Sequence, residues 1–506
     1  MACTSSARAI LLEQIQRTRH KPKEEIVSYI RISEDKIAAF DSELATSFDS
    51  TRTVIQLLER ERLTLAALRY LIAPIRTLPV ELLGEIFLLA ISEYAKWSSH
   101  IVMVLRISHV CTDWNHVANA TPRLWAGHMH VDLARSGRAQ DFYAEGLRSW
   151  LARSAPLSLP ISLRCTDWPL MRINISPRIS EEILRIAPRW RSLQLRASKP
   201  IPASFVRRLA ESKLDDLEEL ELGAIEQDVF NLGDKAILHF NTAPRLRKLR
   251  MTLHSSSVKI VMPWAQLSEL SLSCHSPDIA LAILSQCPNL TTTSIRTTGW
   301  TIPPHTTAAV QNLPYLRTFL FTFAGSSGHF VPFFSNLLMP ELEELSFNFG
   351  EVPGGIVQWT SDRFTAFQLR SPNITRLELT SSYLTAEDLK AALRHAPSLL
   401  HLKLTCCPHS FDDTVIKAMQ YEAGIEPLVP RLHHFVFEET YERMFSQDVL
   451  ADMIASRWWT DDEFSAGSAS PAVSRWTLVH LGSDFTQDFV DAMEILQRKG
   501  LRLEFL

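Results

Sequence analysis

The clearest pattern in this chain is a short hydrophobic motif that recurs through its second half. From about residue 187, Pro-x-Leu-x-x-Leu-x-Leu repeats, with other apolar residues allowed at the leucine positions. Most neighbouring copies begin 21 to 33 residues apart, and the copies cover 187–195, 214–222, 243–251, 264–272, 287–295, 313–321, 339–347, 371–379, 396–404, 429–437 and 473–481.

The spacing within this motif predicts a strand followed by a helix. Leu-x-Leu places two apolar side chains on one face of a strand, and the preceding leucine closes the turn into it. Segments between copies, such as 180–187, 279–287 and 386–395, have the composition of helices. Each strand–helix unit leaves an apolar face exposed until the next unit stacks on it. We therefore predict an α/β fold for residues 181–506, a solenoid of parallel strands alternating with helices.

A different period marks the N-terminal part. Residues 1–24 are polar and basic, and we expect them to be loose. Residues 25–73 contain neither proline nor glycine, which predicts a long helical segment ending before Pro74. Apolar residues recur there every seven positions, with Thr51 breaking the series: Ile30, Ile37, Leu44, Leu58, Leu65 and Ile72.

Two interpretations of this seven-residue period are open. The first is a coiled-coil seam between two copies of the chain. The second is a hairpin, bent near residues 42–50, that folds onto its own protein. The hairpin is favoured because half of the companion seam is polar: Ser33, Ser47 and Glu61 stand where a coiled coil would have apolar residues.

Residues 74–126 are densely apolar and predict three short helices. Pro79 suits the first turn of a helix, and Glu81 lies near the positive end of its dipole. A second helix covers about 101–111, and a third begins near Thr112 or Asp113. A domain of about fifty residues struggles to bury so many large apolar groups. We expect part of this surface to contact another protein.

Residues 127–180 form a transition to the repeats. The segment 142–153 has the pattern of an amphipathic helix, and 161–163 that of a strand. The repeats then account for residues 181–506.

Composition narrows the cellular setting. The net charge of -4 gives no argument for binding nucleic acid or an anionic membrane. The seven cysteines are scattered and form no Cys-x-x-Cys, which is typical of reduced thiols. No apolar run resembles a secretory signal, and 101–105 is too short to span a bilayer. We expect an intracellular protein, cytoplasmic or nuclear.

No group of residues predicts catalysis, a cofactor or a metal. Glycine-rich phosphate-binding motifs are absent from the sequence. The densest reactive cluster, which lacks the ligand spacing of a zinc site, is Cys406, Cys407, His409, Asp412 and Asp413. The adjacent His433 and His434 would point to opposite faces of a strand. A hydrolase would need Cys406, His409 and Asp412 to converge on a pocket, which the repeat pattern does not require. We therefore predict a protein that is not an enzyme.

The repeated motif resembles the leucine-rich repeat in a degenerate form. The Asn or Cys that usually follows three residues after the last leucine is mostly absent; Ser198, Ser382 and Cys407 stand there in some copies. Without a regular ladder at this position, we expect irregular connections and uneven curvature.

The segment 75–125 resembles the F-box. The resemblance rests on three clusters in order: Leu78-Pro79-x-Glu81-x-Leu83-x-x-Ile86-Phe87, then Val110-Cys111-x-x-Trp114, then Pro122-x-Leu124-Trp125. The whole layout, including Ala155-Pro-Leu-Ser-Leu159, is similar to the F-box families expanded in mushroom-forming fungi.

This resemblance implies a mechanism without bond chemistry. The F-box would dock on a Skp-type adaptor, which a cullin–RING ubiquitin ligase holds, while the repeats bind a substrate protein. It implies that the adaptor-binding residues are Leu78, Pro79, Leu82, Leu83, Ile86, Phe87, Leu105, Val110 and Cys111. Trp114, Leu124 and Trp125 would hold the three helices together. Substrate choice would fall to strand positions such as Glu378, His401, Lys403 and His434.

A second interpretation also includes the repeats but assigns the protein no role in a ubiquitin ligase. The protein would then be a non-degradative repeat scaffold whose F-box-like segment is internal packing. The two interpretations differ in whether Leu83, Ile86 and Phe87 are buried against residues 30–72 or face solvent.

Overall fold

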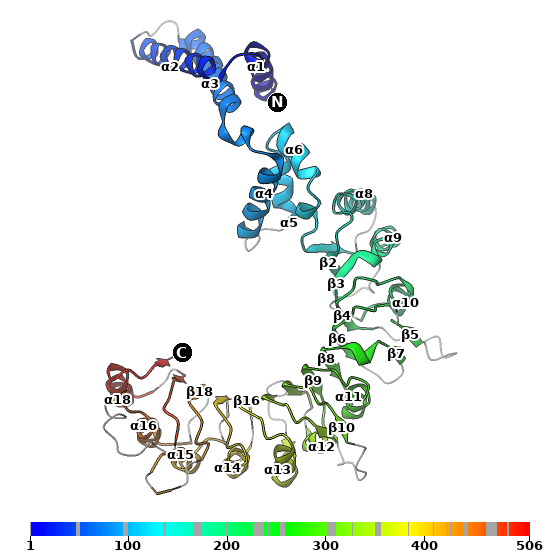
Figure 1. The fold of residues 1–506 in the computed structure, drawn as a ribbon, viewed down its shortest axis with the longest axis vertical. Helices are drawn as coiled ribbons and strands as arrows, with labels where there is room; N and C mark the ends of the chain where they lie inside the picture. Colours follow the sequence, from blue (N-terminus) through cyan, green and yellow to red (C-terminus); the bar gives the residue numbers. More distant parts are fainter. Residues whose placement is uncertain are drawn as a thin grey trace. The chain divides into compact units, whose positions relative to one another are not determined.

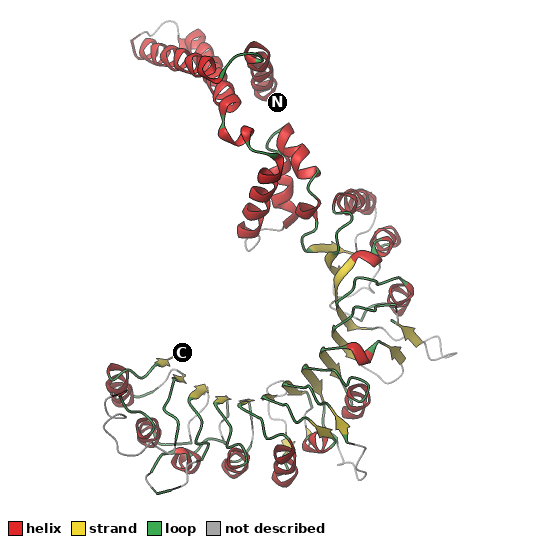
Figure 2. Cartoon of the chain, viewed as in Figure 1, coloured by secondary structure: helices red, strands yellow, loops and turns green. Residues whose placement is uncertain are grey.

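A computed structural model gives the fold of the chain (Figures 1 and 2). It describes residues 2–505 except 47–50, 95–99, 135–137, 166–174, 198–199, 226–236, 241, 254–258, 301–309, 326, 350–355, 383, 408, 423, 426–427, 439–443, 462–472 and 483–484. The chain divides into two compact units, Met1–Trp125 and Ala126–Leu506. The boundary falls within one residue of the end predicted for the second helical segment.

The first unit is helical. Its elements are α1 (Ala2–Thr18), α2 (Lys23–Thr46), α3 (Thr51–Ile72), the short 3-10 helix η1 (Pro74–Thr77), α4 (Val80–Tyr94), α5 (His100–Ser108), α6 (Thr112–Asn119) and α7 (Pro122–Trp125). Helices α2 and α3 pack against each other, and α1 packs against α3. Helices α4 to α7 pack together as a separate group, called here the helical bundle.

The α2–α3 pair is the hairpin of the two interpretations considered. Ile26, Ile30 and Leu68 form its buried core, and Leu65 and Ile72 pack against them. Residues of the seven-residue period thus contact each other within one chain. The connection at 47–50 lies outside the described residues.

The N-terminal segment corrects one prediction. Residues 1–24 were expected to be loose, yet α1 covers Ala2–Thr18. Ile10, Gln14 and Thr18 recur every four residues and are buried, and the Thr18 hydroxyl donates to the Gln14 carbonyl at 2.7 Å. A single apolar side chain in this stripe was too weak a periodic signal to predict the helix from sequence.

The second unit is built on a long parallel sheet. Among the described residues, fourteen strands follow one another in the order β1-β2-β3-β4-β6-β8-β9-β11-β14-β16-β17-β18-β19-β20. Their bounds are β1 Met129–Asp132, β2 Leu159–Cys165, β3 Trp190–Ala197, β4 Glu219–Ala224, β6 Lys248–Leu253, β8 Glu269–Cys274, β9 Thr292–Thr297, β11 Thr318–Phe323, β14 Glu344–Asn348, β16 Arg376–Thr380, β17 His401–Thr405, β18 His434–Glu438, β19 Leu478–Leu481 and β20 Leu503–Phe505. The predicted α/β architecture of parallel strands and helices is confirmed.

Helices connect most strands and lie on one side of the sheet, outside its curve (Figure 2). They are α8 Arg138–Arg153, α9 Pro177–Arg185, α10 Ala203–Glu211, α11 Pro277–Leu284, α12 Val331–Ser335, α13 Ser361–Arg370, α14 Ala386–Arg394, α15 Asp413–Met419, α16 Gln447–Ser456 and α18 Gln487–Arg498, with 3-10 turns at Ala187–Arg189 and Trp264–Gln266. Short outer strand pairs complete the connections: β5 Ile237–His239 with β7 Lys259–Val261, β10 Gln311–Asn312 with β13 Leu337–Leu338, and β12 Ser327–His329 with β15 Ile356–Gln358.

The register explains why the motif is Leu-x-x-Leu-x-Leu. The two motif positions within the strands form continuous rows across the sheet; Leu220, Leu249 and Leu270 belong to one row, and Leu222, Met251 and Leu272 to the next. These side chains are buried against the helices. The alternating strand positions face the opposite side, so the sheet presents polar rows there.

The repeats extend further than the sequence predicted. Residues 127–180 were assigned to a transition, but β1 and β2 already belong to the sheet, and β2 pairs with β3, with one register shift between Leu159 and Pro160. Three strands, β1, β2 and β20, thus lie beyond the predicted copies.

Candidate protein-interaction surfaces

The helical bundle has a core of its own. Leu83 and Phe87 of α4 are buried, and the Phe87 ring lies 4.8 Å from the ring of Trp114 on α6. Leu124 and Trp125 are also buried, and Trp125 Nε1 donates to the Ala118 carbonyl at 2.7 Å. These contacts join α4, α6 and α7 around one apolar centre.

A second apolar stripe on α4 is not used by this core. Leu82, Ile86 and Leu89 are 53%, 41% and 68% exposed, whereas Leu83 and Phe87 are 5% and 1% exposed. The exposed three recur at intervals of four and three residues, so they share one face of the helix. The resemblance implied that Leu82, Leu83, Ile86 and Phe87 all bind the adaptor, but the structure divides them between an exposed and a buried face of α4.

Helix α5, which packs against α4, also exposes apolar side chains. Ile101, Val102 and Leu105 are exposed, while Val104 and Ile107 are buried. Val80 at the start of α4 and Val110 after α5 are exposed as well. Large apolar side chains gathered on neighbouring helices are typical of protein-interaction surfaces. Val80, Leu89, Ile101 and Val102 were not among the predicted interface residues, although Leu89 continues the spacing of Leu82 and Ile86.

The remaining predicted residues lie at helix ends. Pro79 is exposed and Leu78 is half-buried. Cys111, also half-buried, precedes α6, and its sulfur accepts a hydrogen bond from the Trp114 amide at 3.5 Å. Helix α6 begins at Thr112, as predicted, and the residue that caps it is Cys111.

Cys111 and its surroundings also bring α3 close to α6. A hydrogen bond with the Cys111 side chain, with burial adding to it, raises the pKa of Tyr70 to about 12. Arg76 lies over the Tyr70 ring at 4.6 Å and pairs with Asp113 at 3.4 Å. These contacts fix the start of the bundle without covering Leu82 or Ile86, which are exposed.

The second surface is the strand face of the repeat unit. Its polar rows include the positions predicted to select a substrate: Glu378 pairs in register with Lys403, and His401 with His434. The imidazole of His401 lies 4.1 Å from that of His434, at a steep angle between the rings. The structure therefore places the four predicted positions on adjacent strands.

His401 is held in its neutral form. Burial, together with the neighbouring His434, Arg376 and Lys403, lowers the pKa of His401 to about 3. Burial also lowers the pKa of His434. Neither ring nitrogen of His401 has a hydrogen-bond partner among the described residues, and Glu378 is 4.0 Å away.

Reactive side chains elsewhere have structural contacts. Asp412 accepts hydrogen bonds from the Thr414 and Val415 amides at 2.9 and 3.1 Å, and so caps α15. Cys407 is buried, with its thiol 3.5 Å from the Leu379 carbonyl. In the part of the chain that the structure describes, no three or more His, Cys, Asp or Glu residues are grouped as a metal ion would require. None of the described helices combines the length and the apolar character needed to cross a membrane.

Comparison with known proteins gives only distant similarity. No protein-family model matches the chain, and no curated protein does. A Bacteroides fragilis protein of known crystal structure is similar over 73% of this chain and 81% of its own, with 11% identity and a TM-score of 0.28. TLR13, solved in complex with ssRNA13, is similar over 65% of this chain and 49% of its own, with 13% identity and a TM-score of 0.27.

Proposed function

We propose that this protein is a substrate-recognition subunit of a Skp–cullin–F-box ubiquitin ligase. The helical bundle docks on a Skp-type adaptor, and the strand face of the repeats holds a substrate protein. The protein supplies proximity: it raises the effective concentration of substrate lysines near the ubiquitin-charged enzyme. The residue pattern of 75–125 and the polar rows of the repeat sheet support this assignment.

One observation carries the proposal. Leu82, Ile86 and Leu89 form an apolar stripe that the bundle does not need, because Leu83 and Phe87 already fill its core. An exposed apolar stripe costs solubility and is usually covered by a partner. The alternative, a scaffold in which the F-box-like segment is internal packing, predicted that Leu83, Ile86 and Phe87 would be buried against residues 30–72. Leu83 and Phe87 are buried, with Phe87 against Trp114 of the bundle, whereas Ile86 is exposed.

The test uses the full-length chain and a purified Skp-type adaptor. We expect the wild-type protein to bind, and the double variant Leu82→Asp, Ile86→Asp to bind more than about 100-fold more weakly, because each apolar side chain contributes about 1.5–3 kcal/mol when covered. Isothermal titration calorimetry measures the change.

The matched control is Ile55→Asp, Leu57→Asp on α3. Ile55 and Leu57 are 42% and 45% exposed, so the same charges enter at similarly exposed positions away from α4. This control binds the adaptor as tightly as wild type. A wild-type protein that does not bind any Skp-type adaptor would overturn the proposal and favour the scaffold. Leu83→Asp is unsuitable, because it would place a charge in the bundle core.

A further inference from the structure

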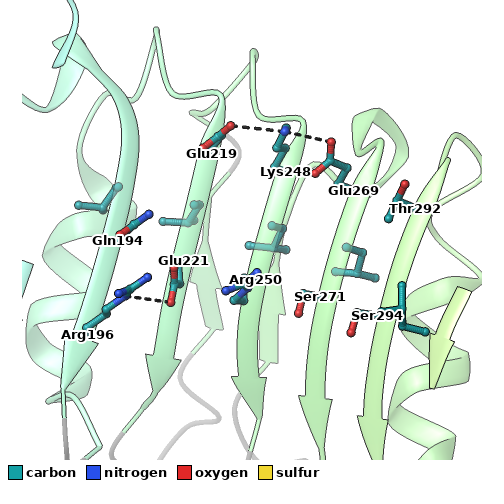
Figure 3. A pocket seen from close by; sticks show the side chains of 15 residues that line it. Gln194, Arg196, Glu219, Glu221, Lys248, Arg250, Glu269, Ser271, Thr292 and Ser294 are labelled. Carbon is teal, nitrogen blue, oxygen red and sulfur yellow. Dashed lines mark ion pairs between the residues drawn. The ribbon is translucent and has the colours of Figure 1, made fainter. Parts of the chain in front are cut away.

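A hollow of about 400 Å³ lies on the strand face of β3, β4, β6, β8 and β9. Polar side chains from neighbouring strands converge on it (Figure 3). The charged residues that line it are Arg196, Glu219, Glu221, Lys248, Arg250 and Glu269. Their formal charges cancel, so their arrangement determines what the hollow can bind.

Most of these charges are paired within the sheet. Lys248 Nζ lies 3.6 Å from Glu219 and 3.0 Å from Glu269, and Arg196 Nε lies 3.4 Å from Glu221 (Figure 3). The hydrogen bond to Glu269 raises the pKa of Lys248, which keeps this ammonium charged. The Arg196–Glu221 pair is neutral, whereas Lys248 between two carboxylates leaves one net negative charge at the Glu219–Lys248–Glu269 group.

Arg250 is the exception. It is exposed and stands opposite Glu221 on β4 and Ser271 on β8, yet it forms no ion pair with any described residue. A guanidinium has five N–H donors in a planar fork that matches a carboxylate. Arg250 therefore offers an uncommitted cationic donor set to a molecule in the hollow.

The row that contains Arg250 continues with different chemistry. Ser271, Ser294 and Leu320 occupy the same register position on β8, β9 and β11. The two serines are half-buried, and Leu320 is 39% exposed, an unusual apolar position on this polar face. The row thus runs from a cation through two hydroxyls to an apolar side chain.

We propose that this row binds an extended segment of the substrate protein, with an Asp or Glu carboxylate on Arg250 and an apolar side chain against Leu320. The inference rests on the proposed function and specifies its substrate class. Three strand spacings separate Arg250 from Leu320, which is about 14 Å at roughly 4.8 Å each. An extended chain covers that distance in about four residues. The acidic and apolar residues are therefore four positions apart, in either direction.

Charge favours a polypeptide with one acidic residue over nucleic acid. Glu219, Glu221 and Glu269 line the same hollow and would repel a continuous run of phosphates. A single carboxylate can approach Arg250 while the serine hydroxyls accept or donate hydrogen bonds to the backbone beside it. The hollow thus selects sparse negative charge.

The experiment is selection of random displayed peptides on the purified full-length protein. Wild type enriches peptides with Asp or Glu four positions from an apolar residue, and Arg250→Glu enriches Lys or Arg at the acidic position instead. Binding of an enriched synthetic peptide falls at least about tenfold in Arg250→Glu and in Arg250→Gln, since a charge-assisted hydrogen bond is lost. Using both variants separates loss of the donor from repulsion by the new carboxylate.

The matched control is Arg207→Glu, an exposed arginine on α10 without an ion pair among the described residues. It retains the wild-type peptide preference. The proposal would be overturned if selection on wild type enriched no acidic residue, or if Arg250→Glu enriched the same peptides as wild type. It would also be overturned if no peptide were enriched and single-stranded RNA bound in a way that depends on Arg250. Adaptor binding measured on the same proteins stays unchanged, so failure of the ligase assignment appears separately.

Discussion

At the scale of single residues, the protonation of His401 on the strand face affects the stability of the repeat unit. The His401 imidazole is buried, and Arg376, Lys403, His433 and His434 all disfavour its protonation. Glu378, 4.0 Å away, acts in the opposite direction but does not offset them. His401 takes up a proton at a higher pH in the unfolded chain than in the folded protein, so folding and protonation are coupled.

We predict that acid destabilises the repeat unit through this residue. The folded pKa of His401 is about 3 against an ordinary 6.5, so its stabilising contribution is complete above pH 6.5 and is lost as pH falls toward 3. Each proton contributes a slope of at most about 1.4 kcal/mol per pH unit. Urea unfolding should show that the free energy of unfolding of the wild-type protein is roughly 1–2 kcal/mol lower at pH 5 than at pH 7. In His401→Gln this difference should be smaller.

His434, His128 and His130 contribute to the remaining pH dependence, because burial lowers their pKa values as well. His401→Gln therefore weakens the pH effect without abolishing it. His395→Gln changes an exposed histidine at the end of α14 and serves as the control. An identical pH dependence in wild type and His401→Gln would contradict the prediction.

Adjacent residues show where sequence reasoning reaches its limit. Leu82 and Leu83 are both leucines in one helix, yet the first faces solvent and the second fills the core. Periodicity predicts that α4 is amphipathic, but it cannot divide a broad apolar arc into a packed stripe and a free one. That division depends on Phe87 meeting Trp114, a contact that requires the tertiary structure.

At the scale of elements, the hairpin of α2 and α3 shows how one pattern satisfies two architectures. The seven-residue period suits a coiled coil between chains or an antiparallel pair within one chain. In the structure, Leu68 of α3 is 1% exposed and packs with Ile26 and Ile30 of α2. The surface ion pairs Arg62–Asp41 at 3.3 Å and Arg69–Glu34 at 2.6 Å also join the two helices.

We predict that Leu68→Ala destabilises this hairpin by about 2–5 kcal/mol, because it leaves a cavity between α2 and α3. Leu57→Ala, on the exposed face of α3, should change the free energy of unfolding by no more than about 0.5 kcal/mol. Chemical denaturation of the full-length chain, followed by hydrogen exchange of peptides from α2 and α3, measures both. Equal effects of the two substitutions would show that Leu68 is not a core residue.

Strands were predictable where the motif is complete and not where it is short. Every predicted copy of the leucine motif forms a strand of the sheet, because three spaced side chains, apolar in each copy except for Thr293, must all reach the core. β1 and β20, with bounds Met129–Asp132 and Leu503–Phe505, are too short to carry that signal. They were missed because only pairing with a neighbour reveals them as strands.

At the scale of the whole molecule, the chain separates a helical unit from a repeat unit, and each has its own core. The boundary and the order of helices and strands followed from changes in hydrophobic period. The exposed stripe on α4 and the lack of an ion pair between Arg250 and any described residue did not, because burial and ion pairing depend on contacts between distant residues. The proposed interaction surfaces are therefore less predictable from sequence than the fold that carries them.

Phenylalanine side chains fill the middle of the repeat unit. The Phe333 ring on α12 lies 5.4 Å from Phe321 on β11 and 5.6 Å from Phe334, and all three are buried. Phe330 and Phe347 extend the cluster to β14. In a solenoid each repeat contacts only its neighbours, so damage to one repeat spreads over a limited distance.

We predict that Phe333→Ala destabilises the repeats around α12 by about 3–5 kcal/mol and leaves distant repeats protected. Hydrogen exchange should rise in peptides from β11, β14 and α13 and stay at the wild-type level in β2 and β3. Leu369→Ala changes an exposed side chain on α13 and should alter neither. If each repeat interacts only with its neighbours, protection from hydrogen exchange is lost only near α12. An equal rise in exchange from β2 to β19 would instead mean that the repeat unit unfolds as one cooperative body.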